Sequence, residues 1–328
     1  MHPAPFIRGR AFPPIPGVPY PRLKPDDASR VPLDTWARAT IPVGVRLELV
    51  GDAEEVQIKY TTRTEDFGHR GEGAGRTFAV WRGGELVDEE KADVGEATIR
   101  VFLGSPPEER AIVYLPQGMR PEIHDVHPAR GSIHPAPLQP RWVVYGDSVA
   151  EGWIASAPAL AWPAIVGREH ELDVINMGFG GAARGEIPVA EQIADTDPDA
   201  ICIAYGTNCW ARTAHSVGQV REGLRAFLEV IRQDHPNAPV VVVTPVVRPD
   251  AEDTPNRLGA SLHAIRHVMQ EVVAAHIDAG DGRMRLVRGR EVLDADMLGD
   301  GIHPNDDGHR ALADAVGREV ASMLPGAR

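Results

Sequence analysis

The hydrophobic pattern of this chain changes its period near Arg141, and this change limits the folds that are open to it. From about Thr35 to Val126, short runs alternate apolar and polar residues, and no helical pattern lies between them. Such a series predicts an antiparallel β-sandwich or jelly roll. Beyond Arg141, short apolar runs alternate with helical patterns, which predicts a βαβ series and a parallel sheet with helices on both faces. We therefore expect two domains, residues 1–135 and residues 136–328.

The two patterns also predict individual elements. The strands expected in the first domain are 45–50, 56–61, 77–81, 97–102 and 111–115. In the second domain, strands are expected at 142–145, 172–175, 200–205, 239–244 and 284–287, with helices at 160–170, 189–194, 218–233, 261–277 and 308–323. The Pro-rich first 34 residues predict an extended arm along the surface of the sandwich. The Pro-rich stretch 127–141 predicts the connection between the domains.

A serine follows the first strand of the second domain, in the segment Tyr145-Gly146-Asp147-Ser148-Val149. Gly146 allows a sharp bend, and Asp147 and Ser148 are typical residues at a helix entry. The Ser148 hydroxyl is thus expected at the carboxyl end of a strand beside helix N-terminal amides, where α/β sheets place their chemistry. A Gly-Asp-Ser triplet is more often an ordinary turn, so a nucleophilic role needs a base, an orienting group and an oxyanion site elsewhere in the chain.

A candidate base lies near the C-terminus, in the turn-rich segment Gly299 to Asn305. Asp300 and His303 are three residues apart, close enough for the carboxylate to reach the imidazole Nδ1. That contact would set the tautomer and leave Nε2 to take the proton of Ser148. The alternative is a helix cap beside a solvated histidine.

Candidate oxyanion donors follow two further strands. Asn176 to Gly181 comes after the strand at 172–175, and Gly206-Thr207-Asn208 comes after the strand at 200–205. A glycine amide and an asparagine amide at neighbouring strand ends can converge on one oxyanion together with the Ser148 amide. Each segment alone is more often a plain strand-to-helix turn, but all of them occur in order after successive strands.

These segments resemble the four blocks of the GDSL or SGNH hydrolases over roughly residues 140–325. The matching segments are Gly146-Asp147-Ser148, Asn176 to Gly181, Gly206-Thr207-Asn208 and Asp300 to Pro304. The resemblance implies a three-layer, flavodoxin-like arrangement. It also implies Ser148 as nucleophile, His303 as general base and Asp300 as its orienter, with Ser148, Gly181 and Asn208 as oxyanion donors. Gly181 is preferred to Gly178, which is expected to serve the turn.

One residue departs from the family pattern. The family commonly has aspartate after the asparagine of its third block, and this chain has Cys209, which affects the local support of Asn208.

A β-domain ahead of the hydrolase domain resembles the layout of carbohydrate esterase family two, whose members remove acetyl groups from sugars. Those enzymes often orient the histidine through a backbone carbonyl, whereas Asp300 is available here.

The composition of the chain limits the classes of partner that it is expected to bind. The formal net charge of −13 argues against nucleic acid and anionic membranes, and it does not favour strongly anionic substrates, although a local arginine cluster could still bind one. No apolar run approaches the roughly 20 residues of a membrane span. The N-terminus lacks the apolar core of a signal peptide, and only Cys202 and Cys209 are present, so a cytoplasmic location is expected. A catalytic role for Cys209 is a weaker alternative.

No metal or cofactor is predicted. His124, His127 and His134 lie near one another in sequence but lack an accompanying cysteine or carboxylate ligand set. The sequence predicts no particular oligomeric state. Its partner is expected to be a small-molecule ester or an acylated carbohydrate.

The sequence therefore predicts a serine ester hydrolase that acts through an acyl-enzyme, deacetylating a sugar or another small polar ester. An aromatic content of 5% and the lack of a long apolar lid favour a small acyl pocket over a lipase site. Four side chains near the strand ends are candidates for substrate binding, with packing or a solvated loop as the alternative for each: Trp153, Trp210, Arg212 and Arg248. Two other functions remain open, an acyltransferase with the same triad and a non-catalytic carbohydrate-binding protein.

Overall fold

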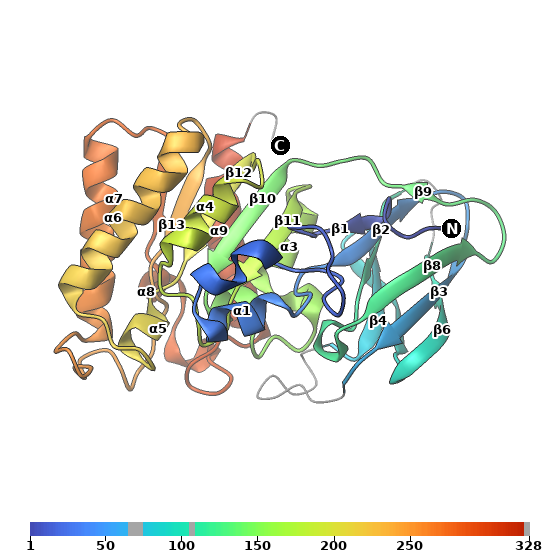
Figure 1. Ribbon diagram of the computed structural model, residues 1–328, viewed down its shortest axis with the longest axis horizontal. Helices are drawn as coiled ribbons and strands as arrows, with labels where there is room; N and C mark the ends of the chain where they lie inside the picture. Colours follow the sequence, from blue (N-terminus) through green and yellow to red (C-terminus); the bar gives the residue numbers. More distant parts are fainter. Residues whose placement is uncertain (65–74, 105–108, 325–328) are drawn as a thin grey trace.

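Five parallel strands form the sheet of the second half of the molecule. The computed structural model describes residues 1–64, 75–104 and 109–324. The strands lie in the order β11 (Asp173–Gly178), β10 (Arg141–Gly146), β12 (Ala200–Ala204), β13 (Val240–Val243) and β14 (Met284–Val287). Every neighbouring pair is parallel. This is the strand order of flavodoxin-like sheets, so the predicted fold class is confirmed (Figure 1).

Helices cover both faces of this sheet because its strands are apolar on both faces. Val143 and Tyr145 belong to a buried cluster with α4, α6 and α7, whereas Trp142 and Val144 belong to the opposite cluster with α3 and α9. The helices of this half are α2 (Ser148–Glu151), α3 (Trp162–Glu169), α4 (Ile187–Ala194), α5 (Thr207–Trp210), α6 (Val217–Asp234), α7 (Leu262–Asp278), α8 (Gly289–Val292) and α9 (Asp306–Met323). Within the described ranges, none of the helices is both long enough and apolar enough to cross a membrane.

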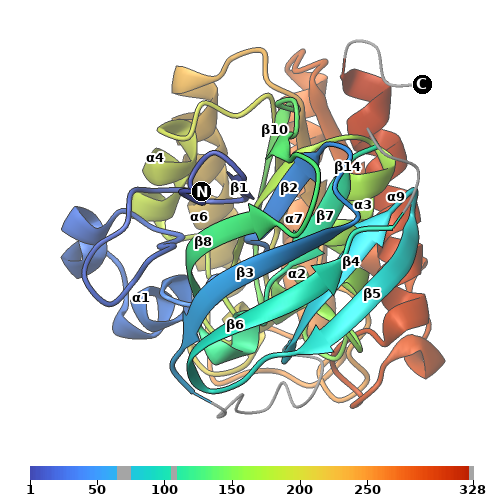
Figure 2. The ribbon, with the colours of Figure 1, turned by 90° about the vertical axis from the view of Figure 1, so that its right-hand side faces the viewer.

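The first half is a sandwich of two antiparallel sheets, as predicted (Figure 2). One sheet has the order β1 (Ile7–Arg8), β2 (Arg46–Val50), β7 (Ala111–Tyr114), β4 (Thr77–Arg82) and β5 (Glu85–Lys91), and β9 (His134–Pro135) also pairs with β2. The other has the order β6 (Gly95–Phe102), β3 (Glu55–Thr62) and β8 (Glu122–Pro128). A buried apolar cluster that includes Leu47, Ile58 and Val113 fills the space between the sheets.

Strands β5, β8 and β9 were not expected from the sequence. Each pairs with a single neighbour among the described strands, so one edge of its backbone needs no partner, which is where charged residues and prolines are tolerated. Strands β8 and β9 therefore occupy part of the stretch 127–141 that was expected to be a connection. The domain boundary after residue 135 stays a prediction.

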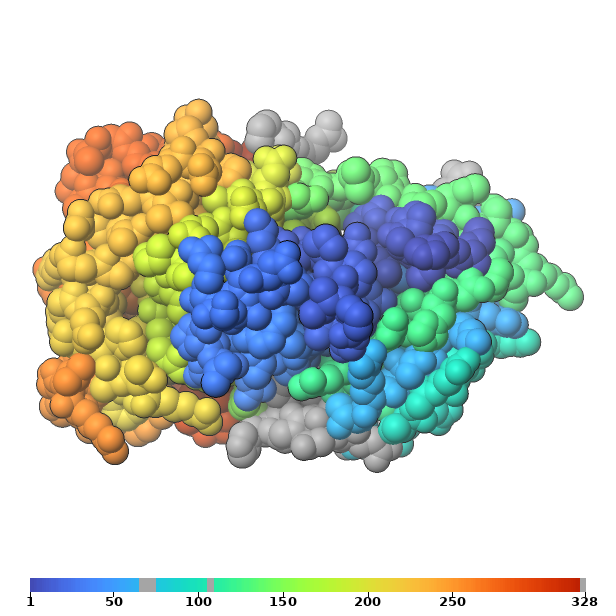
Figure 3. All heavy atoms as spheres, viewed as in Figure 1, coloured from blue at the N-terminus to red at the C-terminus, as the bar shows by residue number. Residues whose placement is uncertain are grey.

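The N-terminal arm differs from its predicted extended form. In the structure it extends to Ala39 and contains a 3-10 helix at Pro25–Arg30 and the helix α1 (Leu33–Ala39), whose last five residues lie where the sequence pattern predicted the start of the β-structure. Phe12, Leu23 and Ala39 join the buried core of the α/β half, whereas Phe6 and Tyr20 join the core of the sandwich. The arm thus packs against both halves, because its apolar side chains lose water contact against each of them. Figure 3 shows its blue atoms lying across the face of the molecule.

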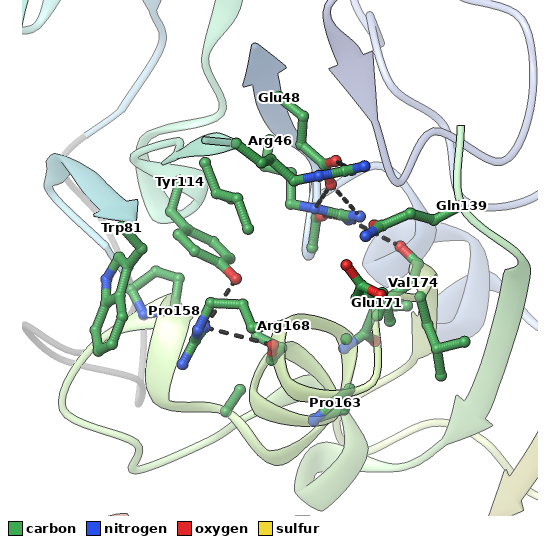
Figure 4. Close-up of a pocket in the computed structure, with 18 of the residues that line it drawn as sticks. Arg46, Glu48, Trp81, Tyr114, Gln139, Pro158, Pro163, Arg168, Glu171 and Val174 are labelled. Carbon is green, nitrogen blue, oxygen red and sulfur yellow. Dashed lines mark hydrogen bonds and ion pairs between the residues drawn. The ribbon is translucent and has the colours of Figure 1, made fainter. Parts of the chain in front are cut away.

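A cavity of about 300 Å³ lies between the sandwich and the helix α3. Trp81, Tyr114, Arg46 and Glu48 line it from the sandwich, and Arg168 lies opposite them (Figure 4). The Arg168 guanidinium donates to the Tyr114 hydroxyl at 2.8 Å and lies 4.2 Å from the centroid of the Trp81 ring. None of the predicted triad or oxyanion residues lines this cavity.

Candidate active site

Ser148 is placed by a sharp turn between β10 and α2. A Cβ on Gly146 would lie 2.4 Å from the carbonyl oxygen of Ala204, so only glycine allows β10 to pass this close to the end of β12. Asp147 caps α2, because its Oδ1 accepts the N–H of Val149 at 3.0 Å. Ser148 is the first residue of α2, so its own N–H has no acceptor within the helix. The hydroxyl and the amide of Ser148 therefore both stand at the carboxyl end of the sheet.

His303 connects Ser148 to Asp300 through two short hydrogen bonds. Its Nε2 lies 2.8 Å from Ser148 Oγ, and its Nδ1 lies 2.7 Å from Asp300 Oδ2. The other carboxylate oxygen of Asp300 accepts the backbone N–H groups of His303 and Ile302 at 2.7 and 3.0 Å. With Nδ1–H facing the carboxylate, Nε2 is the acceptor for the serine proton.

The carboxylate of Asp300 is held in its charged form. Partial burial raises its pKa, but the hydrogen bonds from the His303 side chain and backbone outweigh burial and hold the pKa below its ordinary value. Asp300 is therefore ionised at neutral pH, and it can hold the imidazole in one tautomer and stabilise an imidazolium.

Asn208 presents a side-chain amide without a partner. Its Nδ2 is buried and makes no hydrogen bond to any residue that the structure describes. Because Gly146 lies opposite Ala204 in the parallel pairing of β10 and β12, the segments that lead to Ser148 and Asn208 leave the same edge of the sheet. A buried donor with no acceptor is costly, and functional sites are a common place for one.

The glycines after β11 have separate roles. The amide of Gly178 donates to Asn176 Oδ1 at 2.8 Å within the turn, and the amide of Gly180 donates to Glu151 Oε2. The amide of Gly181 makes no hydrogen bond within the described ranges, and its φ of +71° is one that favours glycine. Of the three amides, that of Gly181 is thus the one available to a substrate oxygen.

Two buried charges that support this turn were missed from the sequence. Glu151, at the end of α2, is fully buried, and Arg22 of the N-terminal arm is 1% exposed. An Arg22 nitrogen lies 4.0 Å from Glu151 Oε1, and Arg22 also donates to the backbone carbonyls of Asn176 and Gly178. No motif marks either residue, and their contacts exist only once the arm has packed against the α/β half.

The four predicted substrate-binding residues fall into two groups. Trp153 is buried with its ring centroid 5.1 Å from that of His303, and the Arg212 guanidinium lies beside Gly181. Trp210 and Arg248 instead contact each other at 4.8 Å, and each has a further partner, Thr254 and Asp250 respectively. The structure thus brings Trp153 beside His303 of the predicted triad and Arg212 beside Gly181, the predicted oxyanion glycine, and a substrate contact for all four residues stays a prediction.

Arg38 of α1 was not predicted at this site. Its guanidinium lies 5.5 Å from the ring centroid of Trp153. The sequence offered no signal for it, since Arg38 falls in the segment from about Thr35 onward where the pattern predicted β-structure.

Cys209 and the three histidines take no part in the site geometry. Cys209 is fully buried, and burial raises the pKa of its thiol, so it is not a thiolate at neutral pH. His124 contacts Thr61, and His127 contacts Asp125, both at 2.7 Å. Across the described residues, no three side chains of His, Cys, Asp or Glu are grouped as metal ligands would be.

Solved structures share this fold over nearly the whole chain. A salicylyl-acyltransferase from a tetracycline biosynthetic pathway has a TM-score of 0.83 and 23% identity, covering 98% of this chain and 96% of its own. A protein from Bacteroides ovatus described as a GDSL-like lipase has a TM-score of 0.79 and 20% identity, covering 99% and 97%. A family two carbohydrate esterase from Clostridium thermocellum has a TM-score of 0.61 and 16% identity, covering 85% and 91%.

Sequence comparison identifies the family directly. No curated protein matches the sequence significantly. The model of the GDSL-like lipase/acylhydrolase family matches residues 139–321, which is more than half of the chain and holds all the predicted triad and oxyanion residues. The chain therefore belongs to the GDSL-like lipase/acylhydrolase family.

Proposed function

We propose that the protein is a serine ester hydrolase that removes a small acyl group, such as acetyl, from a sugar or another small polar alcohol. Ser148 Oγ attacks the ester carbonyl carbon and forms the new C–O bond, while His303 Nε2 takes the hydroxyl proton. The carbonyl oxygen becomes an oxyanion, which accepts hydrogen bonds from the amides of Ser148 and Gly181 and from Asn208 Nδ2.

The second half of the cycle returns the enzyme to its starting state. As the bond to the leaving alcohol breaks, the alcohol oxygen takes the proton from His303 Nε2, and the acyl group stays on Ser148. A water molecule then attacks the acyl carbon and gives a proton to His303. The bond to Ser148 Oγ breaks, the serine takes this proton back, and the free acid leaves.

One observation carries the proposal: the hydrogen-bonded chain from Asp300 through His303 to Ser148 lies at the same edge of the sheet as the Asn208 side-chain amide, which is buried and has no partner in the described structure. The family membership supports the same reaction class. The fold likeness to carbohydrate esterases makes an acetylated sugar a reasonable first substrate.

The test is hydrolysis of p-nitrophenyl acetate, butyrate and octanoate, and of an acetylated xylose, by the wild type and by Ser148→Ala. We expect rapid cleavage of the acetate esters, lost in Ser148→Ala and retained in Ser322→Ala, which changes an exposed serine near the end of α9. Cleavage that survives Ser148→Ala would overturn the proposal. No cleavage of any ester would also overturn the proposal and would leave acyl transfer or non-catalytic carbohydrate binding as the function.

Acyl transfer to an alcohol is the second candidate function. It is favoured by the fold likeness to an acyltransferase, which extends over nearly the whole chain at a TM-score of 0.83. The chemistry differs only in the last step, where an acceptor hydroxyl replaces water on the acyl-enzyme. Mass spectrometry of the products formed with added alcohols distinguishes the two functions, since transfer yields a new ester at the expense of the free acid.

A further inference from the structure

We propose that the ester taken by this site carries an anionic group, a carboxylate or a phosphate, and that Arg38 and Arg212 bind it beside the reacting carbonyl. This inference rests on the proposed function and names the substrate class of the same site. It comes from two guanidinium groups, one beside Gly181 and one over the Trp153 ring, that have no acidic partner in the described structure.

Arg212 lies directly beside the predicted oxyanion glycine. A methyl group placed on Gly181 would lie 3.7 Å from both Cζ and Nη1 of Arg212 and 3.9 Å from its Nε. The guanidinium is therefore next to the amide that is available to a substrate oxygen. Arg212 is exposed, and across the described residues it makes no ion pair or hydrogen bond, so its five N–H groups are open to a ligand.

Arg38 lies over the aromatic ring that packs against His303. Its guanidinium is placed over the ring of Trp153, and the Trp153 ring is beside His303. Arg38 is half-buried, and its side chain makes no hydrogen bond or ion pair to any residue that the structure describes. A cation held on an aromatic ring keeps its N–H edge available for an anion.

Two other arginines, Arg184 and Arg248, differ from Arg38 and Arg212 because each has an acidic partner. Arg184 pairs with Asp34 and also donates to the carbonyl oxygen of Gly181 at 3.2 Å, while Arg248 pairs with Asp250 at 2.9 Å. These two arginines already have acceptors, so their positions are explained by the fold. Arg38 and Arg212 are left without acceptors in a chain whose net charge is −13, in which carboxylates are in excess.

An anionic substrate gives both groups an acceptor. A guanidinium can bind a carboxylate or a phosphate through two parallel hydrogen bonds, which fixes orientation as well as adding affinity. Because the net negative charge of the chain repels anions at long range, attraction at this site must come from nearby cations such as Arg38 and Arg212. The anionic group can belong to the acyl part or to the alcohol part of the ester, and the experiment separates these two sources.

The test compares matched ester pairs. Mono-p-nitrophenyl glutarate against p-nitrophenyl valerate places the charge in the acyl part, and para-acetoxybenzoate against its methyl ester places it in the alcohol. We expect wild-type kcat/KM to favour the anionic member of one pair by about tenfold or more, the strength of a charge-assisted hydrogen bond. Arg38→Gln and Arg212→Gln should each reduce this ratio several-fold, and the ratio should fall as salt screens the charges.

The matched control is Arg318→Gln, an exposed arginine of α9 that forms no ion pair among the described residues. It lies twelve residues beyond the start of α9, about 18 Å along the helix. For Arg318→Gln, the ratio of kcat/KM for the anionic ester to kcat/KM for the neutral ester should equal that of the wild type. Because the ratio is taken within each variant, a general loss of activity cancels, and an equal loss for both esters would assign Arg38 or Arg212 a structural role and overturn the proposal.

A binding measurement keeps the inference testable even if the hydrolase proposal fails. Titration calorimetry of Ser148→Ala with para-acetoxybenzoate, mono-p-nitrophenyl glutarate and their neutral partners needs no turnover. Tighter binding of the charged compound, lost on adding Arg38→Gln or Arg212→Gln, would support the anion site. Equal affinity for the charged and neutral compounds, or a preference that survives both substitutions, would overturn it.

Discussion

The cavity between the two halves and the candidate active site both contain buried polar groups, but they differ in how these groups are paired. In the cavity, Glu48 accepts hydrogen bonds from Arg46 at 2.7 Å and from Arg110, and Arg46 also binds Asp173 at 3.0 Å. In the candidate active site, Asn208 Nδ2 is buried without a partner in the described structure, and Arg38 and Arg212 have no acidic partner there.

Paired polar groups stabilise the fold, whereas unpaired polar groups are available to bind a ligand. Buried charges that are paired link elements of the two halves, as Arg46 links β2 to the carbonyl oxygen of Val174 on β11. A buried polar group without a hydrogen-bond partner lowers the stability of the fold. A substrate or transition state that supplies the missing partner offsets this loss. Substitutions in the cavity should therefore change stability, and substitutions in the candidate active site should change activity.

The largest expected effect is on stability, from Glu48→Gln. This change removes the charge between Arg46 and Arg110 and should lower the free energy of unfolding by about 3–5 kcal/mol, the cost of breaking a buried pair. Urea unfolding measures it, and kcat/KM of the folded protein should be unchanged. The control Glu96→Gln breaks an exposed pair with Lys59 and should leave the free energy of unfolding nearly unchanged. Equal losses in both variants would contradict a structural role of the cavity charges.

Asn208→Ala should lower activity and leave stability nearly unchanged, which is the reverse of the result expected for Glu48→Gln. Loss of an oxyanion donor should lower kcat/KM by about 10²–10³, or about 2.7–4 kcal/mol, while stability hardly changes, because no hydrogen bond of Nδ2 is broken. The control is Asn256, whose Nδ2 donates to the carbonyl oxygens of Cys209 and His215 at 3.2 and 2.9 Å. Asn256→Ala should lower the free energy of unfolding by about 1–3 kcal/mol. A stability loss in Asn208→Ala as large as this would contradict its assignment.

Arg22→Gln should affect both properties, because Arg22 is a buried, paired charge that holds the oxyanion turn. We expect a loss of about 1–3 kcal/mol in stability and a fall in kcat with little change in KM, since oxyanion donors act mainly in the transition state. Arg30→Gln, in the same arm but exposed and paired with Glu191, is the matched control and should do little. A fall in stability with an unchanged kcat would show that the turn keeps its geometry without Arg22.

The smallest expected effect is the pH dependence that Asp300 adds to stability. Its pKa is lowered from the ordinary value of 3.8, so the stabilisation is present above that value and is lost as pH falls through the lower pKa of the folded state. Urea midpoints of the wild type and Asp300→Asn, measured from neutral pH downward, should differ by a constant amount and then converge in acid. Convergence already near neutral pH would rule out the lowered pKa.

The predictions from sequence were most accurate where the signal is local. The three central strands of the parallel sheet were found because at least four apolar residues in a row, such as Val240–Val243, identify a buried strand without help from the rest of the fold. The edge strands β5 and β8 were missed because an edge tolerates charges and prolines, as in the acidic run Glu85–Lys91.

By itself, the sequence determined the period change at Arg141, the two fold classes and the motifs that contain Ser148, Asn208, Asp300 and His303. Each of these features depends on the pattern of residues that are close together in the sequence. Only the tertiary structure decided what surrounds them. Arg22 reaches the carbonyl oxygen of Asn176 across 154 residues of chain, and Arg38 reaches Trp153 from the same arm. Contacts between such distant segments depend on how the arm packs against the sheet, so no local pattern records them.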